Sequence, residues 1–227
     1  MEAEVTKTDN FFDDATYWIA RKIVDAQRDG GIFRLSLCGG STPAPIYEAL
    51  AAREDIDWER VLITFGDERT VPPEDEQSNY RMVKASLLDP AGVPAANVIR
   101  MCGELEPAEA AERCEGQLKK LAQIAGEEIF VHDLILLGMG DDGHTASLFP
   151  ETEALKEEER WVVENFVPKF DTYRITFTYP LIKAAKEVLF LVNGAAKHEM
   201  AENVLAGKPE YPSSAIEAEK VFWLIGG

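Results

Sequence analysis

One stretch decides the fold class: residues 133–144 read DLILLGMGDDGH. Its first part, 133–137, carries four aliphatic residues in a row, a pattern typical of a strand buried on both faces of a parallel sheet. The run ends directly in a turn that combines three glycines with two aspartates and a histidine. We therefore predict a buried strand whose carboxyl end is followed by chemically active side chains.

Similar apolar runs lie on both sides of this stretch and alternate with amphipathic segments. Helical spacing of apolar residues predicts helices at 12–28 and 107–125, and capping signals predict two more near 43 and at 78–88. A further helix is expected at 195–205, between the last two strands. The apolar runs predict strands at 32–37, 61–65, 97–101, 133–137, 160–166, 173–178, 187–192 and 220–225. The alternation predicts an α/β fold with a mainly parallel sheet covered by helices on both faces.

The chain of 227 residues is expected to form one domain, 1–227, because no Gly/Ser/Pro-rich linker interrupts it. Glycine-rich or charged turns follow three of the predicted strands, at 38–43, 66–70 and 138–144. In parallel sheets, ligands bind beyond the carboxyl ends of the strands. We therefore expect the three turns to converge on one crevice.

The first turn contains Gly39, Gly40, Ser41 and Thr42, followed by Pro43. Glycines let a backbone approach a ligand closely, and free amides at a helix N-terminus attract anions. The turn is therefore either a phosphate site or an ordinary strand–helix turn with Ser41 or Thr42 as the helix cap. It has no lysine at the P-loop position, which argues against nucleoside triphosphates.

The second turn, Gly66-Asp67-Glu68-Arg69, places charges just past a buried strand. Asp67 or Glu68 is suited to bind a sugar hydroxyl or to orient a catalytic group, and Arg69 to bind phosphate through two hydrogen bonds. The alternative is a surface salt bridge within the turn. Two later cations are further candidates for anion binding: Arg174 on a predicted strand, and Lys197 in the first turn of a helix.

The third turn matches the spacing GxGxxG of dinucleotide-binding sites, but its other residues argue against such a site. Asp141 and Asp142 would repel a pyrophosphate, and Pro150 ends the following segment before a long crossover helix can form. His144 is instead predicted to be a general base, because its ordinary pKa lies near neutrality. Asp142 is suited to hold one ring nitrogen, although Asp67 could compete for that role.

The remaining histidines, His132 and His198, are predicted to be structural or surface residues, and the three histidines lack metal-ligand spacing. The net charge of -18 argues against nucleic-acid partners, so an anionic substrate needs a local cationic pocket. The three cysteines are expected to be buried, reduced thiols. With no targeting segment or membrane-length apolar run evident, we expect a cytoplasmic protein that is a monomer or a weak homo-oligomer.

Four long stretches together resemble the 6-phosphogluconolactonase family of the pentose phosphate pathway. They span residues 35–50 (LSLCGGSTPAPIYEAL), 63–82 (ITFGDERTVPPEDEQSNYRM), 133–150 (DLILLGMGDDGHTASLFP) and 174–197 (RITFTYPLIKAAKEVLFLVNGAAK). The resemblance implies a Rossmann-like α/β domain, as in glucosamine-6-phosphate deaminases and ribose-5-phosphate isomerases. It also implies hydrolysis of a phosphorylated sugar lactone, without a metal or redox cofactor.

Carried over by position, the resemblance makes His144 the general base and places the substrate phosphate at the turn Gly39–Pro43. It makes Arg69, Arg174 and Lys197 ligands of the phosphate or of the sugar acid. The segment 211–215, Tyr-Pro-Ser-Ser-Ala, departs from the Pro-Ala-Ser usual in the family.

Two other functions compete with lactone hydrolysis. A sugar-phosphate isomerase or deaminase of the same fold would need a relay acid, and the deaminases carry a glutamate five residues after the histidine, where this chain has Phe149. A sugar-phosphate sensor would need neither His144 nor Asp142, and it usually carries an additional DNA-binding or partner module, for which this chain has no room.

Overall fold

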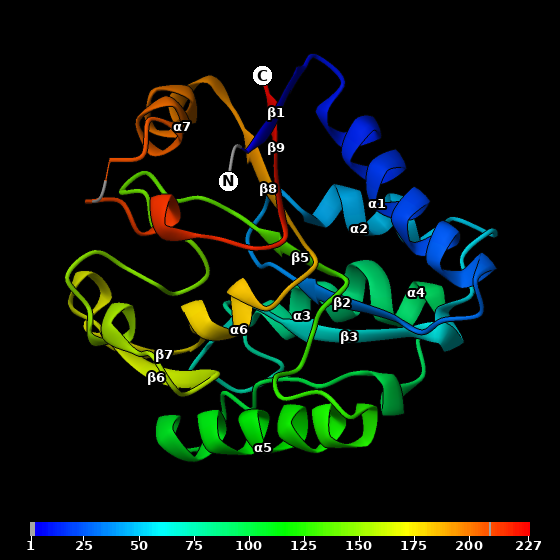
Figure 1. The fold of residues 1–227 in the computed structure, drawn as a ribbon, viewed down its shortest axis with the longest axis horizontal. Coiled ribbons are helices and arrows are strands. Elements are labelled where there is room, and N and C mark those ends of the chain that lie inside the picture. The colour runs from blue at the N-terminus through cyan, green and yellow to red at the C-terminus, as the bar shows by residue number, and fades with distance from the viewer. Residues whose placement is uncertain (1–2, 209) are drawn as a thin grey trace.

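Six parallel strands form the central sheet of the computed structural model, which describes residues 3–208 and 210–227 (Figure 1). In spatial order the strands are β1 (Glu4–Thr8), β9 (Lys220–Gly226), β8 (Glu187–Asn193), β5 (Leu134–Leu137), β2 (Phe33–Leu37) and β3 (Val61–Phe65). The predicted mainly parallel α/β fold is confirmed. The edge strand β1 was missed because four of its five residues are exposed, so that it carries no apolar run.

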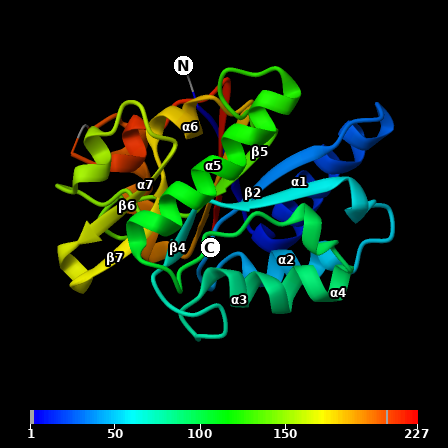
Figure 2. The same ribbon diagram turned by 90° about the horizontal axis from the view of Figure 1, so that it is seen from below.

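Helices cover both faces of this sheet. On one face lie α1 (Phe11–Arg28), α2 (Ala44–Ala51) and the segment formed by α3 (Asn79–Val83), a π-helical turn (Lys84–Leu88) and α4 (Asp89–Ala91). On the other face lie α5 (Pro107–Ala125), α6 (Tyr179–Lys183) and α7 (His198–Leu205). The view from below in Figure 2 shows α1 and α2 on the side away from α6 and α7.

Strand β5 shows why its sequence is apolar without alternation. Leu134 and Leu136 pack into the core beneath α1 and α2, whereas Ile135 and Leu137 pack into the core beneath α5 and α6. All four side chains are at most 1% exposed. Because successive side chains of a strand point to opposite faces, a strand covered on both faces must be apolar at every position.

A second, antiparallel sheet corrects part of the prediction. The strands expected at 160–166 and 173–178 do not join the parallel sheet but form a hairpin, β6 (Val162–Val167) and β7 (Thr172–Phe177). Strand β7 also pairs with β4 (Asp67–Arg69), which was not predicted. The short connection, 168–171, explains the hairpin, because a parallel crossover needs about a dozen residues or more.

Two smaller expectations were wrong. Residues 97–101 form no strand and contribute only an isolated bridge between Val98 and Ile63. Helix α2 has no side-chain cap from Ser41 or Thr42. Its first backbone hydrogen bond runs from the Tyr47 amide to the Pro43 carbonyl, so the helix begins one residue later than expected and leaves both hydroxyls outside it.

The strand order places a topological switch between β2 and β5. From β2 the chain continues outward to β3, and it then returns to β5 on the other side of β2 before adding β8 and β9. Ligands of open α/β sheets bind at such a point. The turns after β2, β3, β5 and β8 all emerge at this edge, so the predicted convergence of the turns is confirmed.

Candidate active site

A cavity of about 350 Å³ lies at the carboxyl ends of the strands. Most of the residues that the sequence singled out line it; Asp142 does not, but it contacts the cavity residue His144, and Glu68 does not reach the cavity. The cavity is large enough for a small sugar phosphate, since ligand pockets span about 300–1,000 Å³. Its lining residues from the three turns and β7 are Gly39, Gly40, Ser41, Thr42, Asp67, Arg69, His144 and Arg174, and Lys197 follows β8.

His144 forms a hydrogen bond through Nδ1 to Oδ1 of Asp142. The same carboxylate oxygen accepts the backbone amide of His144 at 3.2 Å. No hydrogen-bond partner of Nε2 occurs in the described part of the chain. Because an ionised carboxylate at Nδ1 keeps the proton there, the neutral imidazole presents Nε2 as a proton acceptor.

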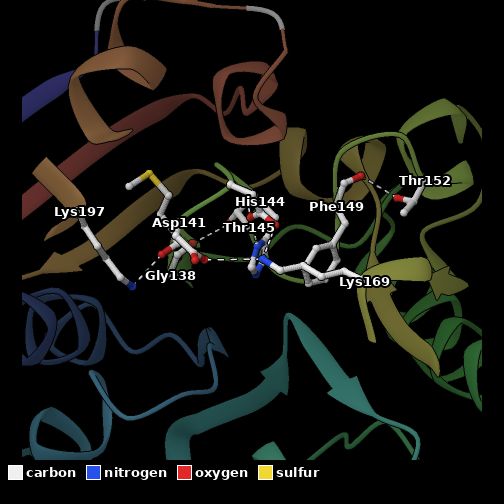
Figure 3. Close-up of polar contacts among 10 residues, drawn as sticks. Gly138, Asp141, His144, Thr145, Phe149, Thr152, Lys169 and Lys197 are labelled. Carbon is white, nitrogen blue, oxygen red and sulfur yellow. Dashed lines mark hydrogen bonds and ion pairs between the residues drawn. The ribbon is translucent and has the colours of Figure 1, made fainter. Parts of the chain in front are cut away.

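Two neighbours fix the plane of the imidazole. Phe149 stacks on it with ring centroids 3.9 Å apart and an interplanar angle of 23°. On Gly140, an added Cβ atom would lie 2.2 Å from Nδ1 and Cε1 of His144, so only glycine leaves room for the ring. Figure 3 shows Phe149 and Lys197 on opposite sides of His144.

Asp142 has a second partner at the tip of the β6–β7 hairpin. Nζ of Lys169 lies 2.9 Å from Oδ2 of Asp142. Burial alone would raise the pKa of Asp142, but the hydrogen bonds from Lys169 and His144 outweigh it and lower the pKa to about 2. The carboxylate is therefore ionised at every pH at which the protein is expected to work.

Asp67, the alternative orienting acid, is held by other residues. Its Oδ2 accepts the Ser147 hydroxyl at 2.6 Å, and its Oδ1 accepts Nδ2 of Asn79 at 3.1 Å. Gly39 makes room for this amide, because a Cβ atom there would lie 1.8 Å from Oδ1 of Asn79. The acid that contacts His144 in the structure is therefore Asp142, and Asp67 lines the cavity without contacting His144.

Glu68 is turned away from the cavity and is 2% exposed. Its carboxylate accepts the amides of Arg69, Asn79 and Tyr80 and the hydroxyl of Ser78. Burial raises the pKa of Glu68, and the three backbone hydrogen bonds oppose that rise. Its position fits anchoring of the N-terminus of α3 rather than contact with a ligand.

Arg69 and Arg174 face each other as register partners of β4 and β7. Like charges directly opposite each other on a sheet repel. The pKa of Arg174 is lowered mainly by burial and, in second place, by the charge of Arg69. A third cation, Lys197, donates from Nζ to the Met139 carbonyl at 2.8 Å and has no acidic partner among the described residues. An anion in the cavity would offset the repulsion between the two arginines.

The turn after β2 brings exposed backbone to the same cavity. Gly40 has φ 95°, a left-handed conformation that glycine adopts without strain. Ser41 is exposed and Thr42 half-buried, so both hydroxyls are free to meet a ligand. The turn was predicted either to bind phosphate or to be an ordinary strand–helix turn capped by Ser41 or Thr42, and the structure shows no such side-chain cap.

The divergent segment 211–215 packs against the turn that carries His144, from outside the cavity. The Ser213 amide donates to the Gly143 carbonyl at 3.0 Å, and the Tyr211 ring lies against Gly143. Tyr179 donates its hydroxyl to the Pro212 carbonyl at 3.0 Å. Two of these contacts use the backbone of the segment, which explains how its sequence can vary.

The three cysteines are buried and free, as predicted. Burial raises the pKa of Cys38 and Cys114 to about 12, which leaves these thiols protonated and unreactive. Within residues 3–208 and 210–227, no cluster of three or more His, Cys, Asp or Glu side chains has the arrangement of a metal site. No helix in the same part of the chain is long and apolar enough to span a membrane.

Several residues around the site were missed by the sequence analysis. Phe149 was considered only as the replacement of a relay acid, and its contact with His144 depends on a turn at 145–148. Ser147 and Asn79 carry ordinary polar side chains whose contact with Asp67 is tertiary. Lys169 lies in no motif, and no local signal in the sequence identifies it.

Comparison with known proteins agrees with this geometry. A family model described as "Glucosamine-6-phosphate isomerases/6-phosphogluconolactonase" matches residues 6–223. The 6-phosphogluconolactonase of Nostoc sp. is 39% identical over an alignment of 231 residues, gaps included, which covers 96% of this chain and 95% of the relative. That of Synechocystis sp. is 38% identical over 212 residues, which cover 91% and 87%.

Solved structures of such enzymes share the whole fold. The crystal structure of 6-phosphogluconolactonase from Thermotoga maritima superposes with a TM-score of 0.88 at 27% identity and covers 100% of both chains. The structure from Trypanosoma brucei superposes with a TM-score of 0.80 at 27% identity and covers 99% of this chain and 96% of that one. On this evidence, the chain belongs to the glucosamine-6-phosphate isomerase/6-phosphogluconolactonase family.

Proposed function

We propose that the protein hydrolyses 6-phospho-D-glucono-1,5-lactone to 6-phospho-D-gluconate, the lactonase step of the oxidative pentose phosphate pathway. One observation carries this proposal: the pair Asp142–His144 faces a cavity whose other walls hold the opposed Arg69 and Arg174. A base beside an anion-binding wall suits an uncharged ester on a phosphorylated sugar. The names of the relatives agree with this reaction.

The reaction begins with proton removal. Nε2 of His144 takes a proton from a water molecule as the water oxygen attacks C1 of the lactone, and Asp142 stabilises the resulting imidazolium. Backbone amides or a cationic side chain of the cavity stabilise the tetrahedral oxyanion. When the bond between C1 and the ring oxygen breaks, His144 returns the proton to that oxygen. The products are a carboxylic acid and a hydroxyl group.

The cations and the first turn hold the substrate. Arg69, Arg174 and Lys197 bind the phosphate or the sugar acid, and Gly39–Thr42 offer backbone amides and hydroxyls. In a chain with a net charge of -18, such a concentration of cations at one edge of the sheet is what an anionic substrate requires. We propose that the enzyme acts in the cytoplasm, where its buried thiols stay reduced, as a monomer or a weak homo-oligomer.

A sugar-phosphate isomerase or deaminase is the second candidate, because the family model covers both activities. Position 149 favours the lactonase. Phe149 occupies the place where a deaminase needs a carboxylate to relay protons, and its ring is stacked on His144. A side chain without an ionisable group cannot move a proton between carbons.

Two assays of the same preparation distinguish these functions. The first follows acid release from freshly prepared 6-phosphoglucono-δ-lactone in a pH-stat, and the second follows ammonia release from glucosamine 6-phosphate. We expect acid release well above the spontaneous rate and no ammonia. Ammonia release with acid at only the spontaneous rate would contradict the lactonase assignment.

A further inference from the structure

Lys169 connects the second sheet to the pair that performs the proposed reaction. It lies in the 3₁₀ turn Pro168–Phe170 between β6 and β7, and its Nζ is 2.9 Å from Oδ2 of Asp142. We propose that Lys169 is a positioning residue, which fixes the orientation and the basicity of His144 through Asp142. This inference rests on the proposed hydrolytic function.

The two oxygens of Asp142 have separate partners. Oδ1 accepts the backbone amide and Nδ1 of His144, and Oδ2 accepts the ammonium group of Lys169. With both oxygens engaged, the carboxylate cannot rotate without breaking a charge-assisted hydrogen bond. The side chain of Asp142 is 27% exposed, so water alone would not hold it in this orientation.

The hairpin tip also acts on His144 through a second residue, Phe149. Phe170 packs edge-on against Phe149, with ring centroids 5.7 Å apart, and Phe149 stacks on His144. The guanidinium group of Arg174 lies over the Phe170 ring at 5.5 Å. One turn therefore contacts two of the groups that hold the imidazole, the carboxylate of Asp142 at its edge and the aromatic ring of Phe149 on its face. Figure 3 shows Lys169 reaching toward His144 beside Phe149.

The charge of Lys169 also acts on the base. A protonated His144 and Lys169 share the negative charge of one carboxylate, so removal of the lysine leaves that charge to the imidazolium alone. The protonated imidazole becomes more stable, and the unprotonated base is lost at a higher pH than in the native protein. The ionisable groups around Asp142 and His144 that the substitution leaves in place include Asp67, Arg69, Asp141, Arg174, Lys197 and Tyr211.

The first test compares pH–rate profiles of the native protein and of Lys169→Met between pH 5.5 and 8. Because Lys169 is 46% exposed, water weakens its effect, and we expect the acidic midpoint of kcat/KM to rise by about half a unit. We expect kcat at pH 6 to fall several-fold, while KM changes by less than about twofold because the lysine is absent from the cavity lining.

Two further variants serve as controls. Lys169→Arg keeps the charge and should retain the native midpoint. Lys183→Met removes an exposed lysine that pairs with Glu217 on the surface, so it matches the change in net charge and should leave the profile unchanged. A profile of Lys169→Met that superimposes on the native one, or an equal shift in Lys183→Met, would overturn the inference.

A second test restores the charge on a folded variant. In Lys169→Cys, the new thiol is exposed whereas the three native cysteines are buried, so 2-bromoethylamine should alkylate position 169 selectively. The product carries an ammonium group on a side chain nearly as long as lysine. We expect this treatment to return the midpoint to the native value and the neutral reagent iodoacetamide to leave it displaced.

Equal profiles after the two reagents would overturn the charge effect independently of any folding defect. Failure of the proposed function is distinguishable from failure of this inference. If the native protein gave only the spontaneous rate of lactone hydrolysis, both would fall, whereas an active native protein with an unaltered Lys169→Met profile would overturn the role of Lys169 alone.

Discussion

His144 and Phe149 lie five residues apart in the chain, yet their rings stack at a centroid distance of 3.9 Å. The turn between them explains the contact. The Leu148 amide donates to the Thr145 carbonyl at 2.9 Å, and Ala146 has a left-handed φ of 47°. The chain thus folds back after the base and places an aromatic ring on it. A deaminase would need an acid at this position to relay protons, whereas this protein has the ring of Phe149, which holds the imidazole in place.

The first prediction concerns Phe149. Phe149→Leu removes the flat partner of the imidazole but keeps an apolar side chain, so kcat should fall about tenfold with little change in KM. The smaller side chain should lower the free energy of unfolding by about 1–2 kcal/mol. Steady-state kinetics and urea denaturation measure the two effects. Phe166→Leu, at a 42% exposed position of β6, is the control, and equal kcat values for the two variants would contradict the prediction.

The second prediction concerns Gly140. In Gly140→Ala, the new methyl group would overlap the His144 ring, and the ring must move away from its place between Phe149 and Asp142. We expect kcat to fall by about 10² or more, since displacement of a catalytic group by about 1 Å has effects of that size.

The matched control is Gly116→Ala in helix α5, where an added Cβ atom meets nothing within 4 Å. This variant should keep its activity and gain about 0.5–1 kcal/mol in stability, because alanine favours a helix. Native activity in Gly140→Ala would show that the His144 ring is not held where the structure places it.

The third prediction concerns the two facing arginines. Arg174→Gln removes one of two facing positive charges that would bind the anionic substrate. KM for the lactone should therefore rise about tenfold or more. The melting temperature of the ligand-free protein should change little, because repulsion from Arg69 is relieved as packing is lost.

Thermal shift measurements with 6-phosphogluconate test the same pair. The product should raise the melting temperature of the native protein and of Arg81→Gln, an exposed position on α3, but not that of Arg174→Gln. Equal shifts in all three proteins would exclude Arg174 as an anion ligand.

The fourth prediction concerns His132, which is 0% exposed and lies 2.9 Å through Nε2 from the Thr64 hydroxyl. Burial, followed by the charge of Arg34, lowers the pKa of His132 to about 3. Below its ordinary pKa of about 6.5 the unfolded chain binds a proton that the folded chain does not, so stability falls as the pH decreases from about 6.5 toward 3.

From pH 8 to pH 5 this one group should remove about 2 kcal/mol from the free energy of unfolding. Urea denaturation of the native protein and of His132→Gln, which keeps a partner for Thr64, measures the difference between the two pH slopes. Identical slopes would mean that His132 is protonated in the folded state.

Much of the fold was predictable because its signals are local. The apolar run 134–137 has no alternation since both faces of β5 are covered, and each of the turns after β2, β3 and β5 contains glycine. The second sheet was not predicted, since an apolar strand has the same composition in a parallel sheet or in a hairpin. Only the short connection 168–171 indicated the difference.

In the candidate site, too, the residues with local sequence signals were predictable and those held by tertiary contacts were not. The residues of the glycine-rich and charged turns, such as His144, Arg69 and Gly39, were predictable because the chain order places them at strand ends. The choice between Asp142 and Asp67 was not, because Ser147 and Asn79 hold Asp67 through tertiary hydrogen bonds. The contact of Lys169 with Asp142 depends on the hairpin and therefore on an element whose placement the sequence did not determine.

The proposed lactonase reaction requires that His144, held by Asp142, activates water. The most direct measurement is acid release from freshly prepared 6-phosphoglucono-δ-lactone in a pH-stat by the native protein, His144→Ala and Asp142→Asn. We expect a native rate well above the spontaneous one, a fall to near that rate in His144→Ala, and an intermediate loss in Asp142→Asn. A His144→Ala variant that retained the native rate would exclude His144 as the general base.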